Sequence, residues 1–290
     1  MIGLKRGTVQ LYDHDPAWEE EARRTILQLQ NILGDVITDI QHVGSTSIRS
    51  IKAKPIIDIM VAVDRFEDIL AFEEPLRKAG FYYRPDSQVT IPHQLLFACG
   101  NHYDGSGDLQ THFIHVVLTN SADHINYINF RDYMNSTPSA AKEYERLKIA
   151  LAQEVPAENG RQKYLAGKHD FIVRMLAKAL AHSYLGKTVE IRIDRPLGST
   201  HPSHPDLVYP VNYGHIPGVI GGDGEELDVY LLGVEEPVDT YLAPIIAMIH
   251  RHNDTEDKLV AAPEGKHFTR EEIAQAVAFQ EQYYESEVEI

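Results

Sequence analysis

The sequence has 290 residues, of which 43% are apolar and 24% charged. This composition excludes extensive disorder and, at roughly 100–200 residues per domain, favours two domains. A single cysteine, Cys99, excludes an internal disulfide and a thiolate metal cage. No apolar run approaches the roughly 18–20 residues that a membrane span needs, and the first residues lack the apolar core of a signal peptide. We therefore expect a soluble cytoplasmic protein that does not contact a membrane.

The net charge of −16 argues against a surface that coats nucleic acid. The charge is unevenly distributed: residues 187–290 contain 7 Lys/Arg against 20 Asp/Glu, net −13, and residues 1–186 contain 20 against 23, net −3. A concentrated acidic segment indicates either a site for divalent cations or merely a solvated face.

The first half begins with an amphipathic helix. Asp15 suits the N-cap, Pro16 the first helical position and Gly34 the stop. Between them, apolar residues recur at three- and four-residue steps: Trp18, Ala22, Ile26, Leu29 and Leu33. The pattern then predicts strands at 36–43, 55–63, 95–98 and 112–118, with a helix that ends near Gly80.

From residue 123 to residue 185 the periodicity is helical, and Pro138 and the segment 156–160 divide it into about three helices. Beyond Gly186 the period changes to two, which predicts short strands as far as Pro263. A final helix is predicted over 269–284, with Thr269 and Glu272 spaced as a capping box. We therefore predict an α+β protein with domains at 1–184 and 185–290.

The segment HVGSTSI at 42–48, followed by KPIIDIMV at 54–61, carries the chemistry of the first half. Gly44 and Ser45 end a strand at a turn, where backbone N–H groups and a hydroxyl can bind an anion. Asp58 lies in an apolar strand, where a carboxylate is costly unless it binds a cation or meets donors. The alternative is an ordinary tight turn beside a locally satisfied aspartate.

These residues resemble the GrpB family, a branch of the nucleotidyltransferase superfamily whose members also occur fused to dephospho-CoA kinases. The resemblance covers 7–182 and extends to THFIHVV at 111–117, FRDYM at 130–134, YERLK at 144–148 and the pair Tyr164 and Lys168. It implies a mixed sheet with helices, nucleotide phosphates held by Gly44 and Ser45, and Mg²⁺ held by Asp58. The superfamily's second carboxylate is replaced by Met60, which puts a two-metal transfer reaction in doubt.

Histidines add a further metal hypothesis. His115 is a candidate ligand beside Asp58, and with His42 and His112 it suggests a transition metal such as Zn²⁺ or Mn²⁺ in place of Mg²⁺. Residues three apart on a strand point to opposite faces, so His112 and His115 are not both ligands unless the strand is bulged. Three cations are candidate phosphate contacts or ordinary surface ion pairs: Arg131, Lys148 and Lys168.

In the second half, GGDGEELDVYLLG at 221–233 places Asp223, Glu225 and Asp228 on one glycine turn. Carboxylates this close repel one another, and divalent cations offset the repulsion. The alternative is a solvated acidic hairpin.

Further candidate site residues flank this turn. Upstream, YPVNYGHIPG at 209–218 supplies two tyrosines, and downstream Glu256 and Lys258 precede an apolar strand. Hydroxyls, cations and massed carboxylates together suit a polyanion bridged by metals.

This combination resembles the soluble inorganic pyrophosphatases, whose domain is a small barrel similar to an OB fold with a terminal helix. The resemblance implies that Asp223, Glu225, Asp228 and Glu256 bind Mg²⁺, with Mn²⁺ as the alternative. It also implies that the first three are catalytic, because they generate a metal-bound hydroxide, and that Lys258 is catalytic as well. It further implies that pyrophosphate is bound by Arg195, Tyr209, Tyr213 and Tyr283. The match departs from the family at Glu225, which replaces an aspartate, and at Tyr284, which replaces a lysine.

The leading interpretation is therefore Mg²⁺-dependent hydrolysis of inorganic pyrophosphate by the second domain, fused to a nucleotidyltransferase-like domain. The fusion has a chemical logic, because nucleotidyl transfer releases pyrophosphate. Two alternatives stay open: a GrpB-type nucleotidyltransferase with an accessory second domain, and a nucleotide- or phosphate-binding protein without catalysis. The expected partners are pyrophosphate and, as a further candidate, a nucleotide. A homo-oligomer stays open.

Overall fold

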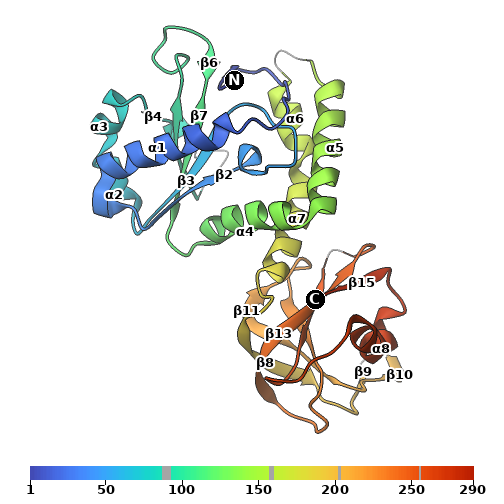
Figure 1. Ribbon diagram of the computed structural model, residues 1–290. Coiled ribbons are helices and arrows are strands. Elements are labelled where there is room, and N and C mark those ends of the chain that lie inside the picture. The colour runs from blue at the N-terminus through green and yellow to red at the C-terminus, as the bar shows by residue number, and fades with distance from the viewer. Residues whose placement is uncertain (87–92, 157–159, 202–203, 255) are drawn as a thin grey trace. The chain divides into compact units, whose positions relative to one another are not determined.

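The computed structural model describes residues 1–86, 93–156, 160–201, 204–254 and 256–290. The chain forms two compact units, an N-terminal unit of residues 1–171 and a C-terminal unit of residues 172–290 (Figure 1). The division falls inside helix α7 (His169–His182), and the predicted domain limit at 184/185 stays a prediction. Among the described residues, no helix is both long and apolar enough to cross a bilayer.

A five-stranded mixed sheet organises the N-terminal unit, with the order β2-β3-β7-β5-β4. The strands β3 and β7 pair in parallel and the other neighbours pair antiparallel. In that order the strands are β2 (Asp39–Val43), β3 (Ile57–Val63), β7 (His112–Leu118), β5 (Leu95–Cys99) and β4 (Tyr82–Tyr83). A separate short ribbon joins β1 (Leu4–Lys5) to β6 (Leu109–Gln110).

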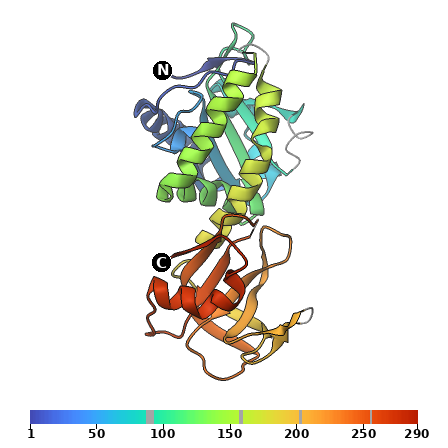
Figure 2. The same cartoon turned by 90° about the vertical axis from the view of Figure 1, so that its right-hand side faces the viewer.

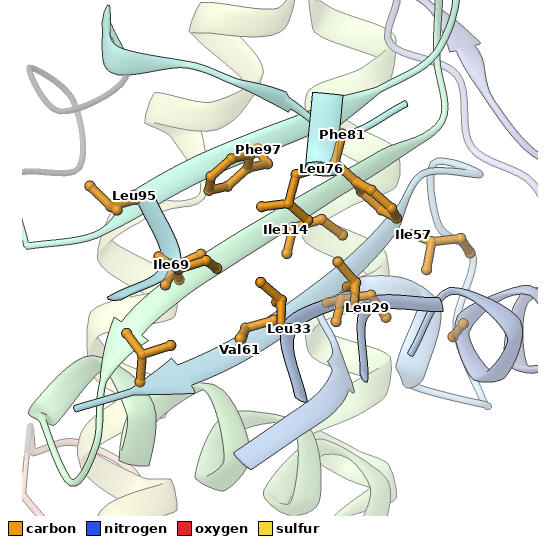
Figure 3. Close-up of a cluster of buried hydrophobic side chains, with 14 of the residues drawn as sticks. Leu29, Leu33, Ile57, Val61, Ile69, Leu76, Phe81, Leu95, Phe97 and Ile114 are labelled. Carbon is orange, nitrogen blue, oxygen red and sulfur yellow. The ribbon is translucent and has the colours of Figure 1, made fainter. Parts of the chain in front are cut away.

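Helices cover both faces of this sheet (Figures 1 and 2). On one face α1 (Ala17–Leu33) buries its predicted apolar stripe against alternate residues of β3 and β7, including Ile57, Val61 and Ile114 (Figure 3). The helices α2 (Phe66–Leu70) and α3 (Glu73–Lys78) add Ile69 and Leu76 to the same core. On the opposite face, α4 (Ala122–Ser136) packs against Met60 and Ala62 of β3. The alternation along β3 therefore separates an apolar face from the face that carries Asp58.

The structure refines several predicted boundaries. The first strand starts at Asp39, because Gly34, with a φ of 54°, leads into a 3₁₀ turn η1 (Gly34–Val36). The segment that was predicted to form about three helices forms four among the described residues: α4, α5 (Pro138–Glu154), α6 (Arg161–Gly167) and α7. The additional division falls at Gly167, where glycine weakens the helix.

A closed five-stranded barrel forms the C-terminal unit, as predicted. It consists of β8 (Thr188–Arg195), β11 (Asn212–Ile220), β12 (Glu226–Leu231), β14 (Lys258–Ala261) and β13 (Thr240–Arg251), which pair in that order and close through β13 and β8. A hairpin, β9 (Thr200–His201) and β10 (His204–Val208), and the strand β15 (Ser286–Glu289) lie outside the closed barrel. The strand β15 was not predicted.

Two apolar clusters hold the C-terminal unit together. The barrel interior contains Ile191, Val229 and Leu259. The outer face carries Tyr213, Tyr230 and Val260, which are covered by Ile273 and Val277 of α8 (Arg270–Glu281). The predicted capping box is confirmed: the Thr269 side chain accepts from the Glu272 N–H, and the Glu272 carboxylate accepts from the Thr269 N–H. The outer face under α8 is where the candidate site lies.

Candidate active site and phosphate site

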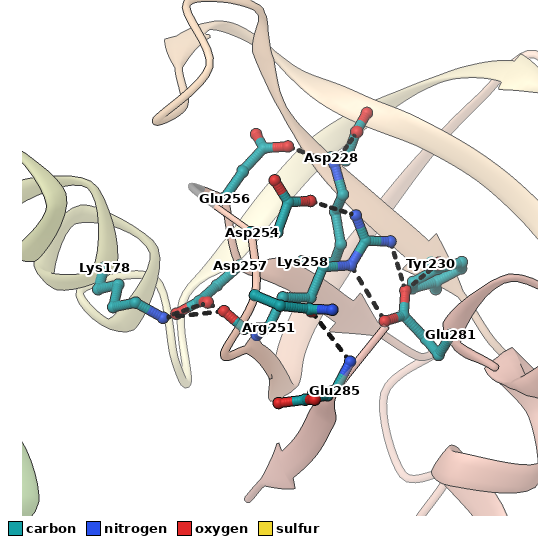
Figure 4. Close-up of polar contacts among 11 residues, drawn as sticks. Lys178, Asp228, Tyr230, Arg251, Asp254, Glu256, Asp257, Lys258, Glu281 and Glu285 are labelled. Atoms are coloured by element: carbon teal, nitrogen blue, oxygen red, sulfur yellow. Dashed lines mark hydrogen bonds and ion pairs between the residues drawn. The ribbon is translucent and has the colours of Figure 1, made fainter. Parts of the chain in front are cut away.

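The candidate active site lies on the outer face of the barrel, where β12 and β14 run in parallel. Val229 and Leu231 point into the barrel, so Asp228 and Tyr230 point outward. The Lys258 ammonium forms ion pairs with both Asp228 and Glu256 (Figure 4). These two pairs raise the pKa of Lys258 above its ordinary value even though burial acts in the opposite direction. Lys258 is therefore a permanent cation at this position.

Two of the predicted tyrosines and the predicted arginine adjoin this group. Burial first, and a hydrogen bond to Asp228 in addition, raise the pKa of Tyr213 well above its ordinary value. Burial also raises the pKa of Tyr209, whose hydroxyl interacts with Arg195. Tyr213 and Arg195 are register partners on β11 and β8, and the rings of Tyr209 and Tyr213 lie 5.5 Å apart. Both phenols are thus neutral donors at physiological pH.

Glu256 is the acid of this group with the least satisfied environment. Its side chain is 3% exposed, and its Oε1 atom has no hydrogen-bond partner. Burial raises the pKa of Glu256 to about 7, with Lys258 acting against the shift and Asp228 and Asp223 adding to it. Gly221 leaves room for this carboxylate, because a Cβ there would lie 2.1 Å from Oε1. A buried carboxylate oxygen without a donor, near other acids, fits a hard cation such as Mg²⁺.

The structure brings some predicted metal ligands together and leaves others apart. Asp223 lies close enough to act electrostatically on Glu256, and its Oδ1 accepts from the Glu225 N–H at 2.9 Å. The Glu225 side chain is exposed on the turn. Within the described ranges, no three His, Cys, Asp or Glu side chains are grouped so that they could hold one metal ion. The metal roles of these acids therefore stay predictions.

Tyr283 is 70% exposed, and no described contact joins it to Asp228 or Lys258. Its neighbour Tyr284 instead lies under Arg251, whose Cζ is 3.6 Å from the ring centroid.

Arg251 was not singled out in the sequence, although an arginine in the apolar strand β13 was a usable signal. It forms an ion pair with Glu281 at 2.6 Å and one with Asp254 at 3.0 Å (Figure 4).

In the N-terminal unit, the predicted phosphate turn and Asp58 are adjacent. Gly44 has a φ of 69°, and a Cβ there would lie 2.4 Å from Asp58 Oδ2, so only glycine fits. Ser45 begins the 3₁₀ turn η2 (Ser45–Ser47) directly beyond Gly44. His115 Nε2 lies 3.3 Å from Asp58 Oδ1, and His115 Nδ1 is buried without a hydrogen-bond partner. This free nitrogen suits a metal ligand or a further donor contact.

The other two histidines, His112 and His42, form their described hydrogen bonds with residues other than Asp58. His112 lies on the opposite face of the sheet, where its Nε2 is 3.2 Å from Thr25 Oγ1, and burial lowers its pKa to about 4. His42 bonds Thr46 Oγ1 at 2.9 Å, and burial lowers its pKa to about 4 as well. The predicted separation of His112 from His115 is confirmed, and the hypothesis of three imidazoles around one metal is wrong.

Comparisons with known proteins match a different family to each part of the chain. The GrpB protein family model matches residues 8–178, and the inorganic pyrophosphatase family model matches residues 153–286. The glutamate-rich protein GrpB of Alkalihalophilus pseudofirmus is 37% identical over 177 residues, which is 61% of this chain and 98% of that protein. The chain therefore belongs to the GrpB family and carries an inorganic pyrophosphatase-type domain at its C-terminal end.

Solved structures were compared as well. The crystal structure of GrpB from Enterococcus faecalis aligns with a TM-score of 0.53 and 27% identity over 60% of this chain and 99% of that one. An inorganic pyrophosphatase from Neisseria gonorrhoeae aligns with a TM-score of 0.29 and 22% identity over 34% of this chain and 74% of that one. The first alignment confirms the predicted fold of the N-terminal unit.

Proposed function

We propose that the C-terminal unit hydrolyses inorganic pyrophosphate to phosphate with Mg²⁺ as its cofactor. The observation that carries this proposal is the buried Oε1 of Glu256, which has no hydrogen-bond partner and lies near Asp228 and Asp223. A second family feature, the pair of tyrosines with Arg195, adjoins the same acids. Carboxylates beside phosphate-binding donors are the arrangement that a metal-assisted phosphoanhydride hydrolase requires.

Each residue has a defined task in this proposal. Asp228, Glu256 and Asp223 hold the cation, with Glu225 as an additional ligand if the exposed turn closes toward them. Bound Mg²⁺ supplies a Lewis acid for the phosphate oxygens and lowers the pKa of a coordinated water. Lys258 and Arg195 neutralise the charge of the phosphates, and the neutral phenols of Tyr209 and Tyr213 donate to phosphate oxygens. Tyr283, although exposed here, is the further candidate for a phosphate contact.

The proposal is tested by measuring phosphate release from pyrophosphate at saturating Mg²⁺. Asp228→Asn removes the charge that holds the cation and should lower turnover by about 100-fold or more, the size of the loss when a principal electrostatic contact is removed. Lys258→Ala should be milder, since it removes one phosphate contact among several. Asp206→Asn is the matched control, because Asp206 is an exposed acid on β10, outside the group around Lys258.

Two outcomes would contradict the assignment. Equal losses in Asp206→Asn and Asp228→Asn would remove the site, and a wild-type protein without hydrolysis under any divalent metal would remove the activity. The exposed Tyr283 favours a second candidate, a protein that binds pyrophosphate without cleaving it. Calorimetric binding of pyrophosphate with no phosphate release would establish that candidate.

A further inference from the structure

His215 of β11 lies on the outer face of the barrel between two carboxylates that have no task in the proposed hydrolysis. Its Nδ1 lies 2.8 Å from Asp194 Oδ2 on β8, and its Nε2 lies 2.8 Å from Glu226 Oε2 on β12. The first contact is a hydrogen bond, and the second is a close approach without the alignment of one. His215 is 8% exposed and is the register partner of Asp228, so a buried imidazole joins three strands beside the proposed metal site.

On the β8 side, the contact holds a β-bulge. The register of β8 against β11 shifts by one residue between Ile193 and Arg195, and Asp194 is the extra residue. Neighbouring residues of a regular strand point to opposite faces, and a bulge re-aims them. The bulge lets Asp194 reach His215 while Arg195 stays directed at the Tyr209 hydroxyl. The contact with His215 therefore fixes the bulge and, through it, the direction of Arg195.

On the β12 side, the contact holds the acidic turn, residues 221–225, which carries two of the proposed metal ligands. The register of β11 against β12 shifts between His215 and Ile220, just before this turn. The Glu226 carboxylate closes the irregular segment, because its Oε1 accepts from the Gly218 N–H at 2.6 Å while its Oε2 faces His215. Glu226 directly follows the acidic turn, so His215 limits how far the turn can move.

The chemistry of the three side chains explains how one histidine holds both segments. Asp194 and Glu226 carry like charges, and their side chains are 42% and 37% exposed, so neither is fixed by burial. An imidazole that is protonated at both nitrogens donates to both carboxylates and offsets their repulsion. The apolar barrel core lies on the other face of these strands. Loss of the imidazole should therefore release the bulge and the acidic turn while the barrel stays folded.

We propose that His215 is a positioning residue of the pyrophosphate site. Through Asp194 it fixes the bulge that directs Arg195 to the phosphates. Through Glu226 it fixes the acidic turn next to Asp228, and it contacts neither the metal nor the substrate itself. This inference rests on the proposed hydrolysis of pyrophosphate, and it adds that substrate binding and metal binding share one support.

The test is steady-state hydrolysis with pyrophosphate and Mg²⁺ varied separately. Asp194→Asn should raise the KM for pyrophosphate by about tenfold, as the loss of one hydrogen bond to a charged group does. Glu226→Gln should instead raise the Mg²⁺ concentration for half-maximal rate by about tenfold. His215→Phe should raise both constants, and combining it with either acid variant should add little, because the pair acts through one contact.

A merely structural role would not separate the two constants. In all three variants kcat at saturation should be retained, which is the pattern of lost binding rather than lost chemistry. His215→Gln keeps one donor and should raise both constants less than His215→Phe does. Glu190→Gln is the matched control, because Glu190 is an exposed acid of β8 outside this group and should leave both constants unchanged.

Two further measurements do not depend on turnover. Calorimetric titration should show Mg²⁺ and pyrophosphate bound about tenfold more weakly by His215→Phe, and the Gly218 N–H should exchange faster with solvent in this variant without metal. A wild type that binds both but does not hydrolyse pyrophosphate contradicts the proposed function, and calorimetry then decides on His215. Unchanged constants in His215→Phe beside an active wild type overturn this inference alone. A wild type that binds neither ligand overturns both.

Discussion

His250 shows how single side chains fix the far end of the barrel strand β13. Its Nδ1 lies 2.8 Å from Asp257 Oδ2 and its Nε2 lies 2.6 Å from Glu289 Oε2. Burial acts to lower the pKa of His250, but the two carboxylates outweigh it and raise the pKa above 6.5. Asp257 in turn has a lowered pKa, because His250 and Lys178 outweigh the effect of its burial. The protonated imidazole therefore links β13 to β15.

This arrangement predicts a pH dependence of stability. Because the folded-state pKa of His250 is raised, its contribution is fully present below its unfolded pKa and is lost as pH rises through the folded pKa. The pKa of Asp257 is lowered in the folded state, so its contribution to stability is lost on acidification. We expect the free energy of unfolding, measured by urea titration from pH 6 to pH 9, to fall with pH less steeply in His250→Gln than in the wild type. Identical slopes would show that His250 is not responsible.

At the residue scale, the sequence identified candidate site residues where residue type and strand alternation determine which way the side chain points. Asp228 and Lys258 were singled out and do adjoin, because both are outward-facing residues of the paired strands β12 and β14. Glu225 shares the turn with Asp223, but sequence spacing does not determine which way a turn side chain points. Lys54 was not singled out, since a lysine before proline has no periodic signal and the Tyr164 ring that its Nζ approaches is 110 residues further along the chain.

At the scale of elements, helix α8 is attached to the barrel by a buried ion pair. Arg251 of β13 and Glu281 of α8 have side chains 2% and 5% exposed, and Arg251 Nε and Nη2 both donate to the carboxylate, at 3.0 and 2.6 Å (Figure 4). The Tyr230 hydroxyl donates to the same carboxylate at 2.6 Å. Together with Ile273 and Val277, this network positions the helix over the site.

Removing one member of this pair should be costly. Glu281→Ala leaves the Arg251 guanidinium buried without its main partner and should lower the free energy of unfolding by about 3–5 kcal/mol. Tyr230→Phe leaves the ion pair intact and should cost about 1.5–3 kcal/mol, the range for a hydrogen bond to a charged group. Gln275→Ala, at an exposed position in the middle of α8, serves as the control and should change little. Denaturant titration gives all three values, and a Glu281→Ala loss no larger than that of Gln275→Ala would contradict the anchoring role.

The same scale shows which elements could be predicted. Helices α1 and α8 carry both periodicity and caps, and strand 112–118 was placed at its exact bounds. The strand β15 was missed because Ser286 to Glu289 is polar and pairs through its backbone with β13. Barrel closure between β13 and β8 is a long-range pairing that local patterns do not encode.

At the scale of the whole molecule, the assignment of helix α7 decides where the two units divide. The GrpB model extends to residue 178 and the pyrophosphatase model begins at residue 153, so both include part of α7. Its C-terminal half makes specific contacts within the C-terminal unit. Lys178 Nζ lies 2.8 Å from Asp257 Oδ1, Asp257 is fully buried, and Ala181 belongs to the barrel core. Separation of the two units by truncation therefore depends on keeping this half of the helix with the C-terminal unit.

This predicts a difference between two fragments of the C-terminal unit. Residues 169–290 should unfold cooperatively, whereas residues 185–290 leave the Asp257 carboxylate without Lys178 and expose the surface that Ala181 covers. We expect the shorter fragment to have a free energy of unfolding lower by about 3–5 kcal/mol, the cost of breaking a buried pair. Lys178→Met in the longer fragment separates the charge from the packing and should reproduce most of the loss. Equal stability of the two fragments by urea titration would place the division near residue 185 instead, and would make α7 a part of the N-terminal unit alone.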